Sequence, residues 1–316
     1  MQITIIGAGM AGLLAGAMLR TEVDKIVEAQ SELPNNHSAL LRFRSTVVGD
    51  AIGVEFKRVQ VLKTVARWRN SVADSLAYAN KCSGVYSSRS SLSAQDELEE
   101  RFIAPTDLVA QLAARVNAPV QYGSQFDFAN CSRAEPVIST IPMPNLMAAL
   151  SYPERSAIEF RHVGGCNINA TVVGCDAYCT IYVPDPSLPF NRISLTGGKL
   201  TIELANYSSA WLRELSGVGL QTNMEALLRE AASMLGISNM NHIVNVLSSD
   251  QRYAKIQSID DSARKRFMLW ATENYNIYSL GRFATWSPKI LLDDCVKDVR
   301  VIRRMIGNGH NYEARI

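Results

Sequence analysis

The sequence lacks a C-x-x-C pair, a long apolar run and a strong excess of charge. Its six cysteines are scattered over 316 residues, which is atypical of a disulfide scaffold or a zinc site. No stretch reaches the roughly 20 apolar residues of a membrane helix, and no basic segment precedes the apolar start as in a signal peptide. The formal net charge of +2 excludes a global basic field. We therefore expect a globular cytoplasmic protein (in the host cytoplasm if it is viral) without a metal site or a membrane partner.

The start of the chain has the order strand, turn, helix, strand and acid that is typical of dinucleotide binding. Residues 2–6 are apolar, and Gly7, Gly9 and Gly12 follow with G-x-G-x-x-G spacing. Such glycines allow a tight turn, a close diphosphate and close helix–strand packing, and the helix N-terminus attracts phosphate. Glu28 ends the second strand, where a carboxylate can accept hydrogen bonds from ribose hydroxyls. A glycine-rich turn of some other α/β protein is the alternative.

The rest of the chain does not continue a simple βαβ repeat. Residues 158–207 alternate like strands between turn residues and predict an antiparallel block. Two short strands are expected at 243–247 and 253–256, and a closing helix at 289–306. Residues 40–70 carry a net charge of +5, which indicates either a solvated face or a patch that faces an anion, such as a cofactor diphosphate or a polyanionic substrate. The basic residues of that stretch are Arg42, Arg44, Lys57, Arg58, Lys63, Arg67 and Arg69.

Further stretches, together with the first, resemble the flavoprotein group that contains amine oxidases, protoporphyrinogen oxidase and UDP-galactopyranose mutase. VISTIP at 137–142 is similar to a strand that lies close to the cofactor, and SLGRFATW at 279–286 is similar to a Gly-Arg segment that brackets the diphosphate and flavin. The resemblance implies FAD, held non-covalently because the flavin-linked cysteine of some amine oxidases has no counterpart. The cofactor-binding residues that it implies are Gly7, Gly9, Met10, Ala11, Gly12, Glu28, Arg42, Arg44, Val120, Thr140, Gly281, Arg282 and Leu291.

The fold that we expect is α/β, with a Rossmann-type FAD-binding domain and an inserted, antiparallel β-rich substrate domain. The FAD-binding domain is discontinuous and takes residues 1–75, 98–145 and 272–316. Residues 76–97 and 146–271 form the substrate domain. The antiparallel block would form a second wall over the flavin, which a binding module has little need of. It therefore favours an enzyme.

Candidate catalytic residues follow from the chemistry that a flavin site needs. Arg192 follows a proline-rich turn and can bind a carboxylate bidentately, and Lys255 on a strand can hold a water near the flavin. Tyr278 and Trp286, with Tyr275 and Phe283 beside them, can wall an amine pocket because aromatic faces attract cations. The alternatives are a surface ion pair for Arg192 and core packing for the aromatic residues.

The expected function is that of an FAD-dependent oxidoreductase or lyase that oxidises a C–N bond of an amine or amino-acid-type substrate. A redox-neutral mutase like that acting on UDP-galactopyranose is one alternative, although its paired UDP-binding tyrosines and arginines have no clear match here. A non-catalytic flavin-binding module is the other. The chain also resembles small phage flavoenzymes that trim amino-acid adducts on thymine in DNA. A modified DNA base, with DNA contacted through residues 40–70, is therefore an expected partner beside a small-molecule amine.

Overall fold

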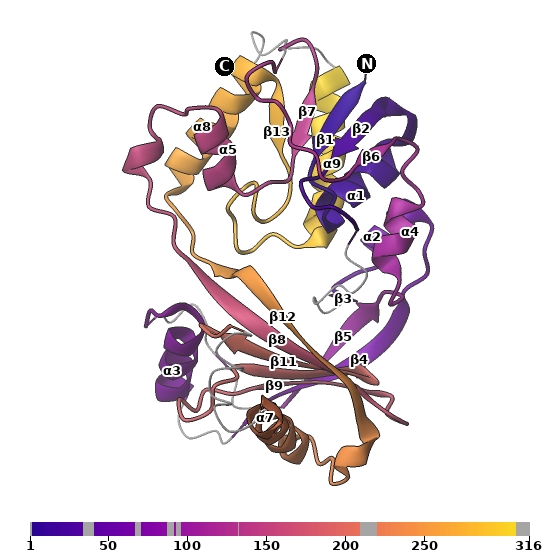
Figure 1. The fold of residues 1–316 in the computed structure, drawn as a ribbon, viewed down its shortest axis with the longest axis vertical. Coiled ribbons are helices and arrows are strands. Elements are labelled where there is room, and N and C mark those ends of the chain that lie inside the picture. Colours follow the sequence, from indigo (N-terminus) through magenta and orange to yellow (C-terminus); the bar gives the residue numbers. More distant parts are fainter. Residues whose placement is uncertain are drawn as a thin grey trace.

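The structure is a computed structural model that describes residues 2–33, 41–66, 71–86, 92, 96–131, 133–208 and 220–307. Arg67 and Arg69 of the basic stretch lie outside these ranges. Two units are stacked along the long axis, one with a parallel sheet between helices and one with a larger curved sheet (Figure 1). Within the described ranges, no helix combines the length and the apolar character needed to cross a membrane.

The upper unit is organised by a five-stranded sheet in the order β13-β7-β1-β2-β6, with every neighbouring pair parallel. Its strands are β1 (Ile3–Ile6), β2 (Val23–Val27), β6 (Val120–Gln121), β7 (Val137–Ser139) and β13 (Ile277–Ser279). Strands β1, β7 and β13 are buried at every residue, as expected for a parallel sheet with both faces covered. The carboxyl ends of these strands meet at one edge, and that edge carries the site.

Helices cover both faces of the parallel sheet. One face carries α1 (Met10–Leu19), α2 (Val47–Ile52), α4 (Leu108–Ala113) and α9 (Leu292–Gly307), and the other carries α5 (Met143–Ala149) and α8 (Asp261–Tyr275). The strands supply each face alternately, because Ile5 belongs to the α1 core and Ile6 to the α5 core. The Asp260 carboxylate caps α8 by accepting the Ala263 N–H at 2.7 Å. The alternation of side chains along each strand therefore decides on which face of the sheet each one packs.

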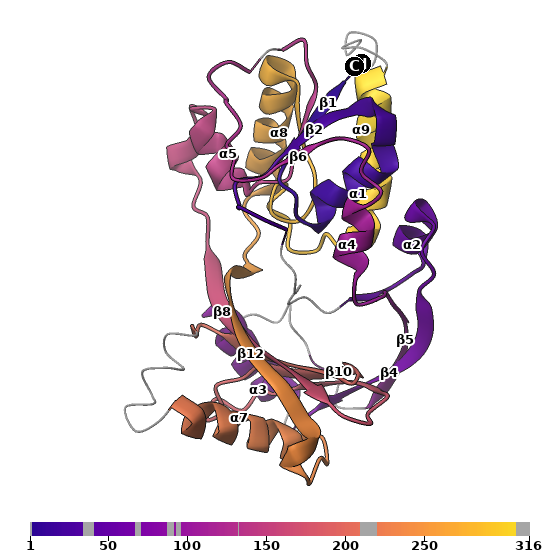
Figure 2. The ribbon, with the colours of Figure 1, turned by 45° about the vertical axis from the view of Figure 1, so that its right-hand side comes forward.

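The lower unit is an eight-stranded sheet in the order β12-β8-β11-β10-β9-β4-β5-β3. Its strands are β3 (Arg42–Phe43), β4 (Lys57–Val65), β5 (Glu97–Ile103), β8 (His162–Val172), β9 (Ala177–Tyr182), β10 (Arg192–Gly197), β11 (Lys199–Ala205) and β12 (Ile243–Ile256). All pairs are antiparallel except β4 with β9. Helices α3 (Ser71–Ser83) and α7 (Leu220–Met234) lie beneath this sheet, whereas β8 and β12 rise toward the upper unit (Figure 2).

The expected mixed α/β fold with an antiparallel block at 158–207 is confirmed. The two short strands expected at 243–247 and 253–256 are wrong, because they form the single strand β12. The polar residues between them resemble a turn in sequence, but β12 is an edge strand whose register with β8 shifts twice. Residues 42–43, 57–65 and 98–103 lie in the eight-stranded sheet, although the sequence assigned them to the cofactor-binding domain. The wider domain division stays a prediction.

Candidate functional site

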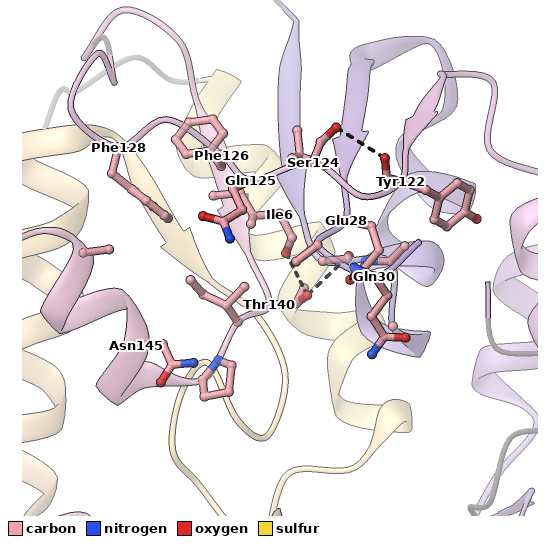
Figure 3. A pocket seen from close by; sticks show the side chains of 18 of the residues that line it. Ile6, Glu28, Gln30, Tyr122, Ser124, Gln125, Phe126, Phe128, Thr140 and Asn145 are labelled. Carbon is pink, nitrogen blue, oxygen red and sulfur yellow. Dashed lines mark hydrogen bonds between the residues drawn. The ribbon is translucent and has the colours of Figure 1, made fainter. Parts of the chain in front are cut away.

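A groove of about 550 Å³ opens at the carboxyl edge of the parallel sheet (Figure 3). The glycine turn after β1 forms its floor, and Glu28 at the end of β2 and Thr140 at the end of β7 form its walls. Other lining residues were not expected from the sequence, among them Tyr122, Ser124, Gln125, Phe126, Phe128 and Asn145. The first four follow β6, so the groove extends along the edge of the sheet away from the turn.

Side-chain hydrogen bonds fix the turn at the base of the groove. One oxygen of the Glu28 carboxylate accepts the Ala8 N–H at 2.6 Å, and the other accepts the Gln30 N–H at 2.8 Å. The Thr140 hydroxyl donates to the Ile6 carbonyl at 2.8 Å. Each carboxylate oxygen keeps a further lone pair for a ligand hydroxyl. Glu28 is therefore positioned both to hold the turn and to bind a ribose.

The three glycines of the motif differ in what surrounds them. A Cβ on Gly12 would lie 1.9 Å from the Gly7 carbonyl oxygen, and a Cβ on Gly7, which has φ +96°, would lie 2.3 Å from the Thr140 hydroxyl. A Cβ on Gly9 would meet no atom within 4 Å. Gly9 thus faces open space at the N-terminus of α1, where backbone N–H groups favour a phosphate. The residues present fit a dinucleotide.

The C-terminal Gly-Arg segment lies directly against the glycine turn. Gly281 has φ +88°, and a Cβ there would lie 3.1 Å from the Cβ of Ala11, which follows Met10 in the first turn of α1. The Arg282 Nε donates to the Ile290 carbonyl at 3.1 Å. Burial, and then the charge of Arg192, lower the pKa of Arg282 below its ordinary value. The segment therefore contacts the first turn of α1 at Gly281 and lines a second cavity, against the eight-stranded sheet, through Arg282 and Phe283.

The second cavity, of about 540 Å³, has a strongly cationic lining. Among the described residues, seven cationic side chains and one carboxylate line it. The cations are Arg42, Arg44, Lys63, Arg101, Arg192, Lys255 and Arg282, and the carboxylate is Glu203. The aromatic residues Tyr182, Tyr253 and Phe283 and the aliphatic Leu291 complete the wall. We call this space the cationic cavity.

Glu203 holds two of the predicted catalytic residues together. It forms an ion pair with Arg192, and the Lys255 Nζ lies 4.0 Å from its second oxygen. Burial alone would raise the pKa of Glu203, but Arg192 and Lys255 outweigh it and the pKa lies below the ordinary value. Burial lowers the pKa of Lys255, although Glu203 opposes this. Lys255 is therefore easier to deprotonate than a surface lysine.

Arg42 has a different environment, because every acceptor around it is neutral. Its guanidinium donates to the hydroxyls of Thr196 and Thr180, each at 2.7 Å, to the Cys179 carbonyl at 2.9 Å, and to the Leu195 carbonyl. Burial lowers its pKa to about 10. Arg42 therefore fixes β3 against β9 and β10 and adds a positive charge to the cavity that no carboxylate at its own nitrogens balances.

Several predicted residues are not in the cationic cavity. Tyr278 is 4% exposed and Trp286 is 1% exposed, and both are packed in the cores of the upper unit. The Trp286 Nε1 donates to the Gln257 carbonyl at 2.9 Å, and Tyr275 packs against Trp270. This burial favours the alternative of core packing for Tyr278 and Trp286, and their place in an amine pocket stays a prediction. Of that expected set, the cavity lining includes Phe283.

The residues of the basic stretch lie in different places, and Val120, an expected cofactor-binding residue, does not line the groove. Arg42, Arg44 and Lys63 face the cationic cavity, whereas Lys57 and Arg58 form exposed ion pairs. The partners of those ion pairs are Asp176 and Glu100. Val120 in β6 pairs with Ile26 of β2 and packs against the core, and Tyr122 lines the groove.

Sequence reasoning missed Glu203, although a signal was present. In β11 the buried residues from Leu200 to Ile202 are followed by Glu203 and then by buried Leu204 and Ala205. A carboxylate within such an apolar strand requires a partner, and here it has two.

No family model and no curated protein sequence matches the chain. Solved structures do resemble it. Reduced UDP-galactopyranose mutase has a TM-score of 0.66 at 15% identity, over 98% of this chain and 94% of that chain. A protein from Exiguobacterium sp. 255-15, provisionally named as a protoporphyrinogen oxidase, has a TM-score of 0.59 at 12% identity, over 98% and 99%. A CLA-producing fatty acid isomerase from P. acnes has a TM-score of 0.57 at 11% identity, over 96% and 98%. At these identities the likeness concerns the fold alone, and the chain shares with these proteins a mixed α/β fold that has a parallel sheet and a curved β-rich sheet.

Proposed function

We propose that the protein is an FAD-dependent enzyme that oxidises a C–N bond in an amino-acid-type group, carried on thymine in DNA. The observation that carries this proposal is the cationic cavity beside a groove that fits a dinucleotide. The chemistry that FAD supplies when bound is two-electron oxidation, in which the carbon beside the nitrogen loses a hydride and the nitrogen a proton. The resulting imine adds water and separates into a carbonyl compound and an amine, and an external electron acceptor completes the cycle.

The charge of the cavity supports an anionic substrate. Glu99 pairs with Lys63 and Arg101 and, with Glu203, leaves a net charge of +5 for the seven cations. The diphosphate of FAD carries about two negative charges, so three positive charges would remain even if both were neutralised here. A simple protonated amine would be repelled by such a field. An amino-acid adduct on a nucleotide carries a carboxylate and a phosphate, and it suits the field better.

The residues around Glu203 suit the reacting end of such a substrate. The guanidinium of Arg192 is planar and can bind a carboxylate with two parallel hydrogen bonds. In its neutral form, which burial favours, the Lys255 Nζ can take a proton from a substrate nitrogen, and the net charge of the cavity is then one less until the proton arrives. Phe283 and Tyr253, whose ring centroids are 5.7 Å apart, exclude water from one side. Arg192 therefore orients the group, and Lys255 moves the proton.

A DNA substrate has a geometric requirement. The thymine edge is buried in a duplex, so the nucleotide must be extruded or single-stranded to enter. The cationic cavity, at about 540 Å³, lies in the range of small-molecule sites and can accept one nucleotide. DNA contact through residues 40–70 remains part of the proposal for Arg42, Arg44 and Lys63, which line the cavity.

The test begins with the visible spectrum of the purified protein, where a flavin that is released on denaturation is expected. The flavin is then followed under anaerobic conditions after addition of adduct-bearing DNA, of the same adduct as a free nucleoside, and of free amino acids. Bleaching by the DNA adduct is the expected result. Bleaching by a free amino acid alone would replace this proposal with an ordinary amine oxidase, and no bleaching by any of them would favour a non-catalytic flavin-binding module.

A second candidate is a redox-neutral sugar-nucleotide mutase. The likeness to reduced UDP-galactopyranose mutase favours it, and a diphosphate would suit the cationic cavity. Turnover of UDP-galactopyranose by the chemically reduced protein, without net change in the flavin spectrum, would select this candidate.

A further inference from the structure

One wall of the cationic cavity holds three cations that the reacting end does not use. Arg44 follows β3, Lys63 lies in β4 and Arg101 lies in β5, which are neighbouring strands of the same sheet. The Glu99 carboxylate pairs with both Lys63 and Arg101, and Arg101 also donates to the Glu100 carbonyl at 2.7 Å. Glu97 also acts on Lys63 and Asp293 on Arg101, so the carboxylates around this wall concentrate on two of its three cations.

Arg44 is the cation of this wall that can bind a ligand without losing a protein partner among the described residues. It is exposed, and the described part of the chain offers its guanidinium no hydrogen bond or ion pair. Its charge lowers the pKa of both Lys63 and Arg101, which places the three groups within electrostatic range of one another. Glu99 holds two of the cations in place, so Arg44 is left to bind an anion.

This wall is separate from the two places already described. No residue of the glycine turn lines the cationic cavity, so the wall does not belong to the diphosphate end of the groove. Strand β9, which carries Tyr182, lies between β10 with Arg192 and β4 with Lys63, so it separates the wall from the Glu203 pair. A substrate that spans the cavity would thus contact the wall at one end and Arg192 at the other.

We propose that Arg44, Lys63 and Arg101 form a subsite for a phosphate group of the substrate. The planar guanidinium of Arg44 can bind two phosphate oxygens, and Lys63 and Arg101, held in place by Glu99, add positive charge beside it. This inference rests on the proposed function, since it assigns the nucleotide phosphate to the wall and the amino-acid group to Arg192. The phosphate can come from a free nucleotide or from a DNA backbone.

The test measures binding to the flavin-loaded protein and needs no turnover. Thymidine, thymidine 5′-phosphate, inorganic phosphate and a short single-stranded oligothymidylate are titrated by calorimetry. The wild-type protein should bind thymidine 5′-phosphate roughly ten times more tightly than thymidine, as expected for charge-assisted hydrogen bonds. Arg44→Gln and Lys63→Gln should each remove most of that difference and keep their flavin. Lys57→Gln is the matched control, because Lys57 lies in the same strand but pairs with Asp176 on the surface.

The two sources of phosphate are separated by the oligothymidylate. If it binds more tightly than the mononucleotide, and Arg44→Gln lowers the slope of log affinity against log salt by about one contact, the phosphate comes from a DNA backbone. Equal affinities indicate a mononucleotide, and both results support the subsite. Equal binding of thymidine and thymidine 5′-phosphate by the wild type would overturn it, as would loss of flavin from Arg44→Gln, which would make Arg44 a cofactor ligand. Absence of flavin bleaching would instead count against the proposed oxidation and leave this result intact.

Discussion

Adding one methyl group should weaken cofactor binding at Gly9 but destabilise the fold at Gly12. The Cβ of an alanine at position 12 would lie 1.9 Å from the Gly7 carbonyl oxygen, whereas at position 9 it would meet no atom within 4 Å. Gly9→Ala should therefore keep the fold and weaken the cofactor, because the new methyl group occupies the open space before α1. Gly12→Ala should damage the fold itself.

The magnitudes follow from the geometry. A carbon and a carbonyl oxygen normally stay about 3.3 Å apart, so Gly12→Ala forces the turn and α1 apart by more than 1 Å. Such overpacking costs about 3 kcal/mol of unfolding free energy. Gly9 has φ −69° and ψ 175°, which alanine adopts freely. Reduced freedom of the unfolded chain stabilises Gly9→Ala by about 0.4–1 kcal/mol, and the poorer N-cap offsets this by a similar amount.

The assays are urea unfolding of the cofactor-free protein and fluorescence titration with FAD. With a urea dependence of about 3 kcal/mol per M, the midpoint of Gly12→Ala should fall by about 1 M, while that of Gly9→Ala should stay within about 0.3 M. Gly9→Val, which has the larger side chain, should lose nearly all FAD binding, with Gly9→Ala between it and the wild type. A wild-type midpoint for Gly12→Ala, or wild-type FAD affinity for Gly9→Val, would refute this assignment of roles.

Three further substitutions test the remaining groups. Glu28→Ala should lower FAD affinity about tenfold or more, since hydrogen bonds to a carboxylate contribute roughly 1.5–3 kcal/mol, and unchanged affinity in the same titration would contradict a ribose contact. Glu203→Gln should destabilise the protein by about 2 kcal/mol at pH 7. Because the pKa of Glu203 is lowered in the folded protein, the variant's urea midpoint should stay below that of the wild type above pH 4.5. The difference should disappear as the pH falls through the folded pKa. Trp286→Ala should cost about 3–5 kcal/mol and leave the affinity of folded protein for thymidine 5′-phosphate unchanged, and a loss of that affinity alone would return Trp286 to the site.

The dinucleotide groove could be predicted from sequence because its main parts are close together in the chain. The glycine turn and Glu28 fall within one strand–helix–strand unit, where spacing determines geometry. Gly281 was found through a resemblance and not through spacing. Its contact with Ala11 depends on β13 joining the same sheet as β1, which no local pattern indicates.

The cationic cavity could be predicted only in part, because strands far apart in sequence form it. Lys63 aligns with Thr180 and Arg192 with Glu203, so charges from separate segments converge only after the sheet is complete. The basic stretch was interpreted as either a solvated face or a patch that faces an anion, and in the structure it divides. Lys63 lines the cavity, whereas Lys57, on the same face of β4 but near its other end, forms an exposed ion pair. The aromatic character of Trp286 did not show whether it lines a site or packs in a core. In the structure it is buried in a core.

The parallel pairing of β4 with β9 has a consequence for how the protein is made. The glycine turn leaves the ribosome before the rest of its sheet, which gains β7 and β13 only when residues 137–139 and 277–279 have been synthesised. Likewise β4 finds no partner in β9 until residues 177–182 are available. Contacts of such long sequence separation make folding slow. FAD added to a refolding reaction should therefore stabilise the final state without speeding its formation, and the N-terminal segment alone should not hold the cofactor.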